Sequence, residues 1–284
     1  TRQAAAQTGL AEGIPVVVGG HDHICAALAV GAITPGPVLD SIGTVEAFMV
    51  TLDQPALGAE MAGSGLWCGC HTARDRYYLL GGVMAGSVFD WVCRSLVGDS
   101  SPETLEMLIR EASASPTGAN GVWFFPYLEG SGPPIRDPGS TGSWLGLRLH
   151  HQRSDLVRAA LEGLSYSSHS LLELIEAGAG YPIGELHAVG GGTRNHLWQQ
   201  IKASVMGRPV SVASVADVTA QGAALLAGIG VGIFKDEQEA ARCAFRPSAE
   251  FSVDEENRLF YAEAYREVFC RLYPAPSKLP LAGT

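Results

Sequence analysis

The spacing of hydrophobic residues along the chain predicts strands and helices in alternation. Short runs of β-branched and aromatic residues predict strands, because such side chains suit a half-buried pleated surface. The predicted strands are 16–18, 38–42, 46–51, 66–70, 77–81, 121–128, 186–189 and 209–213. Apolar residues three or four positions apart predict helices. The predicted helices are 24–30, 84–96, 102–112, 154–178, 218–227 and 254–272, with one more through 197–205 and a short helical lead-in within 1–13. Strand-turn-helix units recur, so the pattern is typical of an α/β protein.

Composition and charge narrow the class of protein. With 284 residues, of which 46% are hydrophobic and 17% charged, the chain suits one large or two modest globular domains. Its net charge of −10 argues against a nucleic-acid or anionic-membrane partner. We find no apolar run long enough to cross a membrane and no signal peptide, so we expect a cytoplasmic protein whose six cysteines are reduced. Because it opens at Thr1 without Met, we expect a piece of a longer protein.

The stretch VVVGGHDHICAALAVG, residues 16–31, contains the first candidate for chemistry. Gly19 and Gly20 interrupt the predicted strand, and Asp22 follows at the start of the predicted helix. A helix N-terminus favours a carboxylate there, which suits either a helix cap or a catalytic group at a sheet edge. The flanking His21 and His23 are expected to pack behind this carboxylate or face solvent, with contact to a substrate as the alternative.

Two glycine turns suggest an anion site. Gly43-Thr44 joins two predicted strands, and such a tip offers backbone N–H groups and one hydroxyl, although a plain turn is the alternative. The sequence GGGT, residues 190–193, joins a strand to a helix, which is typical of a nucleotide site. Its spacing differs from the G-x-G-x-x-G of dinucleotide-binding folds, and no lysine follows a Walker-type loop. The pair Cys68 and Cys70 is expected to be structural, because no second pair of metal ligands stands nearby.

Taken together, these segments resemble the C-terminal half of an FGGY-family carbohydrate kinase, in the actin- and hexokinase-like ATPase superfamily. The resemblance rests on the segments GGHDHICAALAVG, SIGT, MAGSVFDWV, VGGGTRNHLWQQIKASVMGRPV and ADVTAQGAALLAGIGVG. In the last of them Asp217 stands where the family has a glutamate. The order and spacing of the segments agree over nearly the whole chain.

The resemblance implies a fold and an activity. The fold is an RNase H-like (actin-like ATPase) one, with a mixed sheet flanked by helices. Residues 1–32 would end an N-terminal sugar-binding domain and carry the catalytic aspartate, and residues 33–284 would form the nucleotide-binding domain. The activity would be ATP-dependent phosphorylation of a sugar or polyol hydroxyl, with ATP and Mg²⁺ as cofactors and a homodimer as one possible assembly. The alternatives are a non-catalytic actin-like interaction module and a phosphohydrolase of the same superfamily.

The resemblance also implies roles for single residues. Asp22 matches the base that faces the sugar hydroxyl. Gly43 and Thr44 match the turn that contacts the β- and γ-phosphates. The remaining matches concern the nucleoside: Gly191, Gly192 and Asn195 hold the adenosine, and Gly86 and Asp90 line the adenine pocket. Asp90 departs from the glutamine expected at its position, which weakens that assignment.

One further departure bears on substrate range. The segment PYLEGSGPP has Ser131 and Gly132 where the family often has Glu and Arg. The family's N-terminal domain supplies most sugar contacts, and pentulose, hexulose and polyol kinases share the segments present here, so this sequence does not identify the sugar and leaves the metal ligands unknown.

Overall fold

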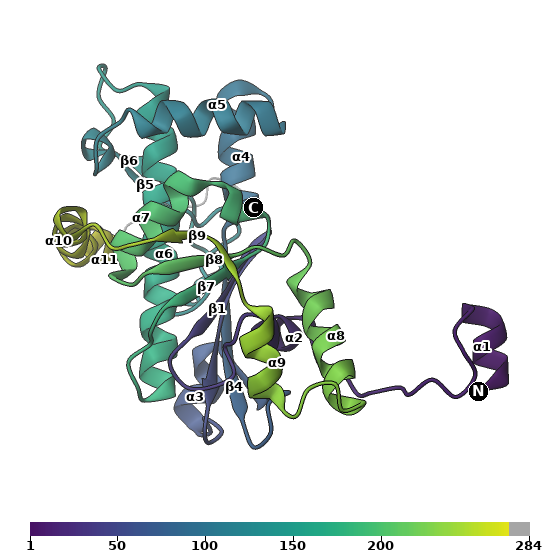
Figure 1. The fold of residues 1–284 in the computed structure, drawn as a ribbon. Helices are drawn as coiled ribbons and strands as arrows, with labels where there is room; N and C mark the ends of the chain where they lie inside the picture. Colours follow the sequence, from purple (N-terminus) through teal and green to yellow (C-terminus); the bar gives the residue numbers. More distant parts are fainter. Residues whose placement is uncertain (273–284) are drawn as a thin grey trace.

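A seven-stranded mixed sheet forms the centre of the computed structural model, which describes residues 1–272 apart from the side chain of residue 60. The strand order is β3-β4-β2-β1-β7-β8-β9 (Figure 1). The bounds of the strands are β1 Val38–Ile42, β2 Val45–Leu52, β3 Trp67–Cys70, β4 Tyr77–Met84, β7 Leu186–Val189, β8 Val210–Ala213 and β9 Pro247–Phe251. Strands β3, β4, β2 and β1 pair antiparallel, β1, β7 and β8 pair parallel, and β9 is antiparallel to β8. The predicted mixed α/β sheet is therefore confirmed.

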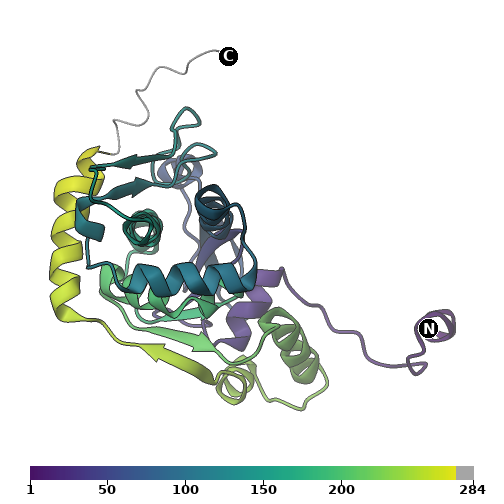
Figure 2. The ribbon, with the colours of Figure 1, turned by 90° about the horizontal axis from the view of Figure 1, so that it is seen from above.

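Helices cover both faces of this sheet (Figures 1 and 2). One face carries the long helix α6 with α4, α5 and α7 around it, and the other carries α2, α8 and α9. Their bounds are α2 Asp22–Ala29, α4 Gly86–Val97, α5 Pro102–Ser113, α6 Arg153–Ala179, α7 His196–Met206, α8 Val218–Gly230 and α9 Glu237–Ala244. A small antiparallel sheet, β5 Trp123–Phe125 with β6 Ser143–Leu145, packs on α6. The C-terminal helix α10 Glu255–Ala264 packs on α7 and continues through a π-helical segment, Tyr265–Phe269, into α11 Cys270–Leu272.

Alternation along β1 explains how one strand serves two cores. Val38 and Ile42 belong to the apolar cluster beneath α6 and α7, whereas Leu39 belongs to the cluster beneath α2 and α8. Successive side chains of a strand point to opposite faces, so apolar residues at neighbouring positions pack into the cores on both sides of the sheet. Asp40 is in phase with Val38 and Ile42, and its side chain is fully buried on the α7 side.

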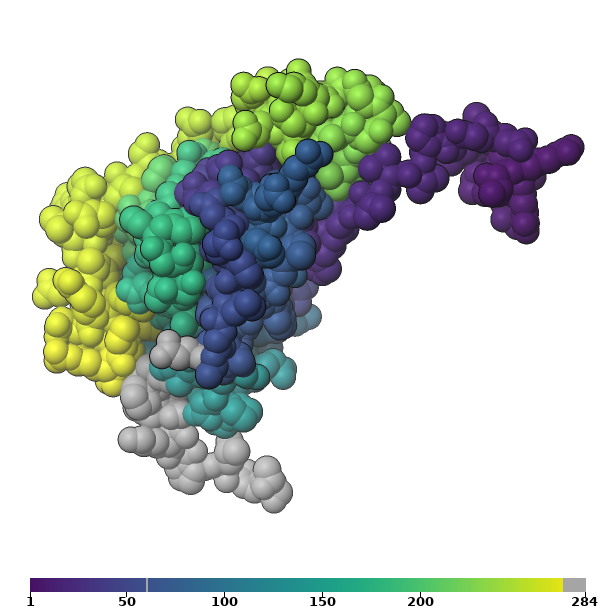
Figure 3. Space-filling view, turned by 90° about the horizontal axis from the view of Figure 1, so that it is seen from below, coloured from purple at the N-terminus to yellow at the C-terminus, as the bar shows by residue number. Residues whose placement is uncertain are grey.

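The predicted strand over 16–18 is absent. Val16 and Val18 are 93% and 89% exposed, in an extended segment that leaves the body and ends in α1 Arg2–Thr8 (Figure 3). A strand requires the N–H and C=O groups of a neighbouring strand, and no strand of the described residues lies beside this segment. Its β-branched residues alone therefore do not make it a strand.

The other differences are at the ends of elements and in elements that have no predicted counterpart. The aromatic strand predicted over 121–128 is only β5, because Pro126 has no N–H with which to continue the pairing. Helix α6 begins with a capping box of Gln152 and Asp155 rather than at Ser154, and it ends at Gly180, where φ is 74°. Strand β4 extends to Met84, so α4 starts two residues later than predicted. The elements that were not predicted are helix α3 Ala59–Ser64, α9, β6, β9 and the short helical turns Ala119–Gly121 and Gly191–Arg194.

The structure bears on two of the predictions, that the cysteines are reduced and that the chain contains no membrane-spanning segment. None of the six cysteines forms a disulfide. Among residues 1–272, no helix has both the length and the apolar character of a membrane span. The predicted second domain extends to residue 284, and residues 273–284 lie outside the described part of the chain.

Candidate active site

Asp22 is the first residue of helix α2, whose position is set by close packing against α8. Residues 24–29 of α2 are all buried. A Cβ added at Gly222 of α8 would overlap the carbonyl oxygen of Cys25, so only glycine permits this approach of the two helices. The N-cap position of α2 belongs to His21, and Asp22 does not cap the helix in the usual way. Its side chain is 59% exposed at the wall of a cavity.

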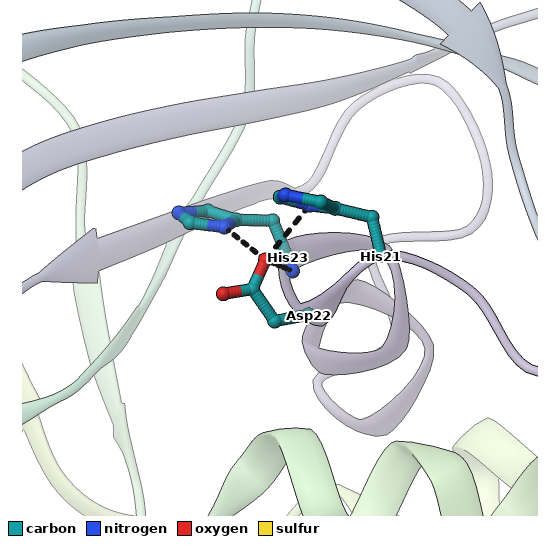
Figure 4. Close-up of side chains that lie close together, drawn as sticks. All are labelled: His21, Asp22 and His23. Atoms are coloured by element: carbon teal, nitrogen blue, oxygen red, sulfur yellow. Dashed lines mark hydrogen bonds and ion pairs between the residues drawn. The ribbon is translucent and has the colours of Figure 1, made fainter.

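Two imidazole rings flank the carboxylate of Asp22 (Figure 4). Asp22 Oδ1 lies 2.7 Å from His21 Nδ1 and 2.9 Å from His23 Nδ1, and it accepts a hydrogen bond of 2.7 Å from the N–H of His23. The hydrogen bond from the His23 ring, with its backbone N–H and the charge of both rings, lowers the pKa of Asp22 against the effect of partial burial. Asp22 is therefore ionised at neutral pH. The other carboxylate oxygen takes no part in these contacts and points away from both rings (Figure 4).

The cavity beside Asp22 has a volume of about 850 Å³. His21, Asp22, His23 and Gly43 line it together with the loop 129–135. Ser131 and Gly132, which stand where the family often has Glu and Arg, are therefore part of its wall. The hydroxyl of Ser131 donates to the carbonyl of Ile135 within the loop.

The turn Gly43-Thr44 is held against the start of helix α4. The carbonyl of Gly43 accepts a 3.2 Å hydrogen bond from the N–H of Gly86, and the carbonyl of Thr44 accepts bonds of 3.2 and 3.1 Å from the N–H and hydroxyl of Ser87. No side chain caps α4 at Ala85, so these carbonyls satisfy the free N–H groups of the helix. A Cβ on Gly86 would overlap the carbonyl oxygen of Gly43. The glycine predicted to line the adenine pocket thus has a packing reason of its own.

The second turn packs against the other side of β1. A Cβ on Gly190 would lie 2.6 Å from the carbonyl oxygen of Ile42, and one on Gly192 would overlap the Ile42 side chain. Gly191 is exposed, and a Cβ there would meet only Arg194, at 3.7 Å. Gly190 and Gly192 thus bring the turn close to β1, while Gly191 leaves its outer side open.

Asn195 caps helix α7, which follows this turn. Its Oδ1 accepts a 3.0 Å hydrogen bond from the N–H of Trp198. Its Nδ2 is buried and has no partner among the described residues. A buried amide donor without a partner is costly, so this atom fits a ligand group that the turn would bind.

The predicted site residues fall into two groups that meet at Gly43. Asp22 shares the cavity with Gly43. Gly86 and the 190–192 turn contact the two sides of the same hairpin, and Asp90 lies one helical turn beyond Gly86 in an ion pair of 2.9 Å with Arg94. The nucleoside candidates do not line the cavity. The hairpin tip therefore separates a cavity with a carboxylate from a glycine-rich surface.

One cluster of side chains could ligate a metal ion in the described residues. His21, Asp22 and His23 each offer one ligand atom, all within 4.8 Å of one another. Two imidazoles and one carboxylate suit a transition-metal ion better than Mg²⁺, which prefers oxygen ligands. The carboxylates on the cavity wall are Asp22 and Glu129, and Mg²⁺ commonly takes one or two such groups together with phosphate oxygens.

A buried cluster of three charged side chains was not predicted from the sequence. Lys202 of α7 lies in the core between Asp40 of β1 and Glu46 of β2, and all three side chains are 0% exposed. The sequence signal for this cluster is Asp40, a charged residue on the same face of its strand as the apolar Val38 and Ile42.

Comparison with known proteins identifies the family. The model of the C-terminal domain of the FGGY family of carbohydrate kinases matches residues 39–231. The chain is 29% identical over 280 residues to the xylulose kinase of Staphylococcus epidermidis, which covers 98% of this chain and 55% of that protein. It is 36% identical over 237 residues to the L-fuculokinase of Escherichia coli, covering 84% of this chain and 48% of that protein. The crystal structure of xylulose kinase from Rhodospirillum rubrum matches with a TM-score of 0.84 at 29% identity, over 98% of this chain and 56% of that one.

The chain spans about half the length of these relatives. The family match includes the Gly43-Thr44 hairpin, the start of α4 and the Gly190–Asn195 turn, while Asp22 precedes it. The chain therefore belongs to the FGGY family of carbohydrate kinases and corresponds to its C-terminal half.

Proposed function

We propose that this chain supplies the nucleotide-binding half and the catalytic base of an enzyme that transfers a phosphoryl group from ATP to a hydroxyl of a sugar or polyol. The observation that carries the proposal is the shared cavity of Asp22 and Gly43, which sets an ionised carboxylate beside the turn predicted to hold the phosphates. FGGY kinases use ATP, and the similar proteins are named for sugar substrates.

Each part of the site then has one task. Gly43 and Thr44 hold the transferring phosphates, and the free oxygen of Asp22 orients the substrate hydroxyl and accepts its proton. A carboxylate with a lowered pKa is a weak base, but a loose phosphoryl-transfer transition state mainly requires an oriented nucleophile and late proton acceptance. His21 and His23 lower the pKa of Asp22 below its ordinary value and hold its other oxygen in place.

The nucleoside is assigned to the glycine-rich side of the hairpin. Gly191, Gly192 and Asn195 would hold the adenosine, with the unpaired Nδ2 of Asn195 as a donor to it. Gly86 and Asp90 would line the adenine side. Mg²⁺ bound with ATP would neutralise phosphate charge, and Asp22 and Glu129 are the cavity carboxylates available to such an ion.

The remaining assignments are coarser. We propose that residues 1–32 belong with the N-terminal domain of the complete enzyme, although α2 itself packs on α8. We propose a pentulose, hexulose or polyol as the substrate class, and the similar proteins are named xylulose kinase, L-fuculokinase and gluconokinase. We propose a cytoplasmic location, which is typical of FGGY kinases. A homodimer is also proposed, and sedimentation velocity would test it.

The decisive experiment measures ATP consumption with and without a panel of ketoses, aldonates and polyols. It uses the chain alone and the chain joined to an N-terminal half of the kind its relatives carry. Turnover that depends on one sugar supports the kinase. Turnover without sugar would indicate a phosphohydrolase, and no turnover with no ATP binding would indicate an interaction module.

A binding experiment separates the nucleotide site from the activity. Gly191→Val places a side chain on the open side of the turn and should weaken ATP binding about tenfold or more, a change of about 1.4 kcal/mol. Calorimetry on the folded variant measures it. Unchanged affinity would mean that this turn is only structural.

A further inference from the structure

A buried cluster of charges lies directly behind the Gly43-Thr44 turn. The ammonium group of Lys202 forms ion pairs with Asp40 and Glu46, and the hydroxyl of Ser168 donates a 2.6 Å hydrogen bond to the second oxygen of Glu46. The Lys202 ammonium also lies 5.5 Å from the ring centre of Phe48. The lysine, both acids and the serine are fully buried.

The cluster joins segments that are far apart in the sequence. Asp40 lies in β1, three residues before Gly43, and Glu46 lies in β2, two residues after Thr44. In the strand register Glu46 is opposite Ile42, so both acids stand on the α7 face at the base of the hairpin. Lys202 comes from α7, the helix that Asn195 caps. One ammonium group therefore connects both arms of the phosphate turn to the helix that begins at the nucleoside turn.

Burial of these groups is not explained by stability alone. Removing three ionisable groups from water costs several kcal/mol per ion, and apolar replacements of similar volume are often as stable or more stable. Burial and the neighbouring Glu46, opposed by Lys202, raise the pKa of Asp40. Burial alone would lower the pKa of Lys202, but Asp40 and Glu46 more than offset this and raise it. Within the cluster the carboxyl of Asp40 is therefore protonated more readily than in water, and Lys202 stays charged at neutral pH.

We propose that Lys202 is a positioning residue that fixes the Gly43-Thr44 turn relative to the N-terminus of α7, so that phosphate and nucleoside contacts are held in one geometry. Directional bonds to both arms of the hairpin restrict its tilt, which apolar packing of the same volume would leave less restricted. Because the turn also caps α4, a shift of the hairpin would be transmitted to the bonds with Gly86 and Ser87.

The test uses a variant in which the cluster keeps its shape and loses its charge, Lys202→Met with Asp40→Asn and Glu46→Gln. The first readout is hydrogen exchange at three amides that report the turn: Gly43, which donates to Val45, and Gly86 and Ser87, which donate to Gly43 and Thr44. The second is ATP affinity by calorimetry, which rests on the proposed function. We expect protection at these amides to fall about tenfold or more and the Kd for ATP to rise by about the same factor.

A matched control separates positioning from stability. Arg158 and Glu162 of α6 form another buried ion pair, with a 2.9 Å bond and no contact with the hairpin. Arg158→Met with Glu162→Gln should alter global stability without a selective effect on the three amides or on ATP.

The outcomes are distinguishable. If the charge-free variant keeps its protection at Gly43, Gly86 and Ser87, the positioning role of Lys202 is wrong. If protection falls only in step with global stability, as in the control, it is also wrong. If the wild-type chain fails to bind ATP, the proposed function is wrong, while the exchange measurement still decides the inference.

Discussion

Gly86→Ala is expected to displace the phosphate turn by an amount that the structure allows us to estimate. The new Cβ would overlap the carbonyl oxygen of Gly43, so the hairpin and α4 must separate by roughly 1 Å to reach ordinary contact. The bonds from the N–H groups of Gly86 and Ser87, now 3.2 Å each, would then exceed hydrogen-bonding length. Loss of two or three such bonds with local strain costs about 2–4 kcal/mol.

This cost has two measurable consequences. The melting temperature should fall by about 5–10 °C, the shift typical of such a free-energy change in a chain of this size. The affinity for ATP should fall about tenfold or more, because the turn that holds the phosphates has moved. Differential scanning calorimetry and isothermal titration measure the two effects.

Gly63→Ala is the matched control. Gly63 is exposed in helix α3, and a Cβ there would meet nothing within 4 Å. Alanine in a helix should be neutral or stabilising by up to about 1 kcal/mol. If Gly86→Ala behaves like this control in both assays, the turn is not held by α4 and the reasoning fails.

Three further predictions concern chemistry. In an enzyme completed by an N-terminal half, Asp22→Asn should lower kcat about 10²–10⁴-fold with unchanged ATP affinity and melting temperature, and retained turnover would exclude a base role. Thr44→Val should lower kcat about 10²-fold with little change in sugar KM, as measured by ADP release, and a normal kcat would leave an ordinary turn. The titratable groups that act on Asp40 are Glu46 and Lys202, and burial raises the pKa of Asp40 to about 8. The folded state therefore keeps a proton that the unfolded state loses above about pH 4. The contribution of this proton to stability is complete below pH 4 and is lost as the pH rises to 8; urea titrations at pH 5, 6.5 and 8 should show this fall in wild type and a weaker one in Asp40→Asn, and equal slopes would refute it.

Local signals in the sequence were enough to place the turns. Gly43-Thr44 lies between two largely apolar segments, and the structure has β1 and β2 on either side of it. The run of glycines after Val189 likewise predicted a strand-turn-helix unit, because glycine interrupts regular structure wherever it is concentrated. The family resemblance rested on these same local segments, which is why it could be recognised before the fold.

Only the tertiary structure decided which residues stand together. Val16 and Val18 have the composition of a strand, yet pairing depends on a neighbouring strand that their own sequence does not specify. The family resemblance assigns Gly86 to the adenine pocket, whereas in the folded chain the carbonyl oxygen of Gly43 occupies the space that a Cβ at this position would need. Lys202 and Asp40 are 162 residues apart and meet because β1 and α7 pack on the same side of the sheet. Periodicity marks a position as buried, but the partner of a buried charge is set by long-range packing, and that is information local sequence does not contain.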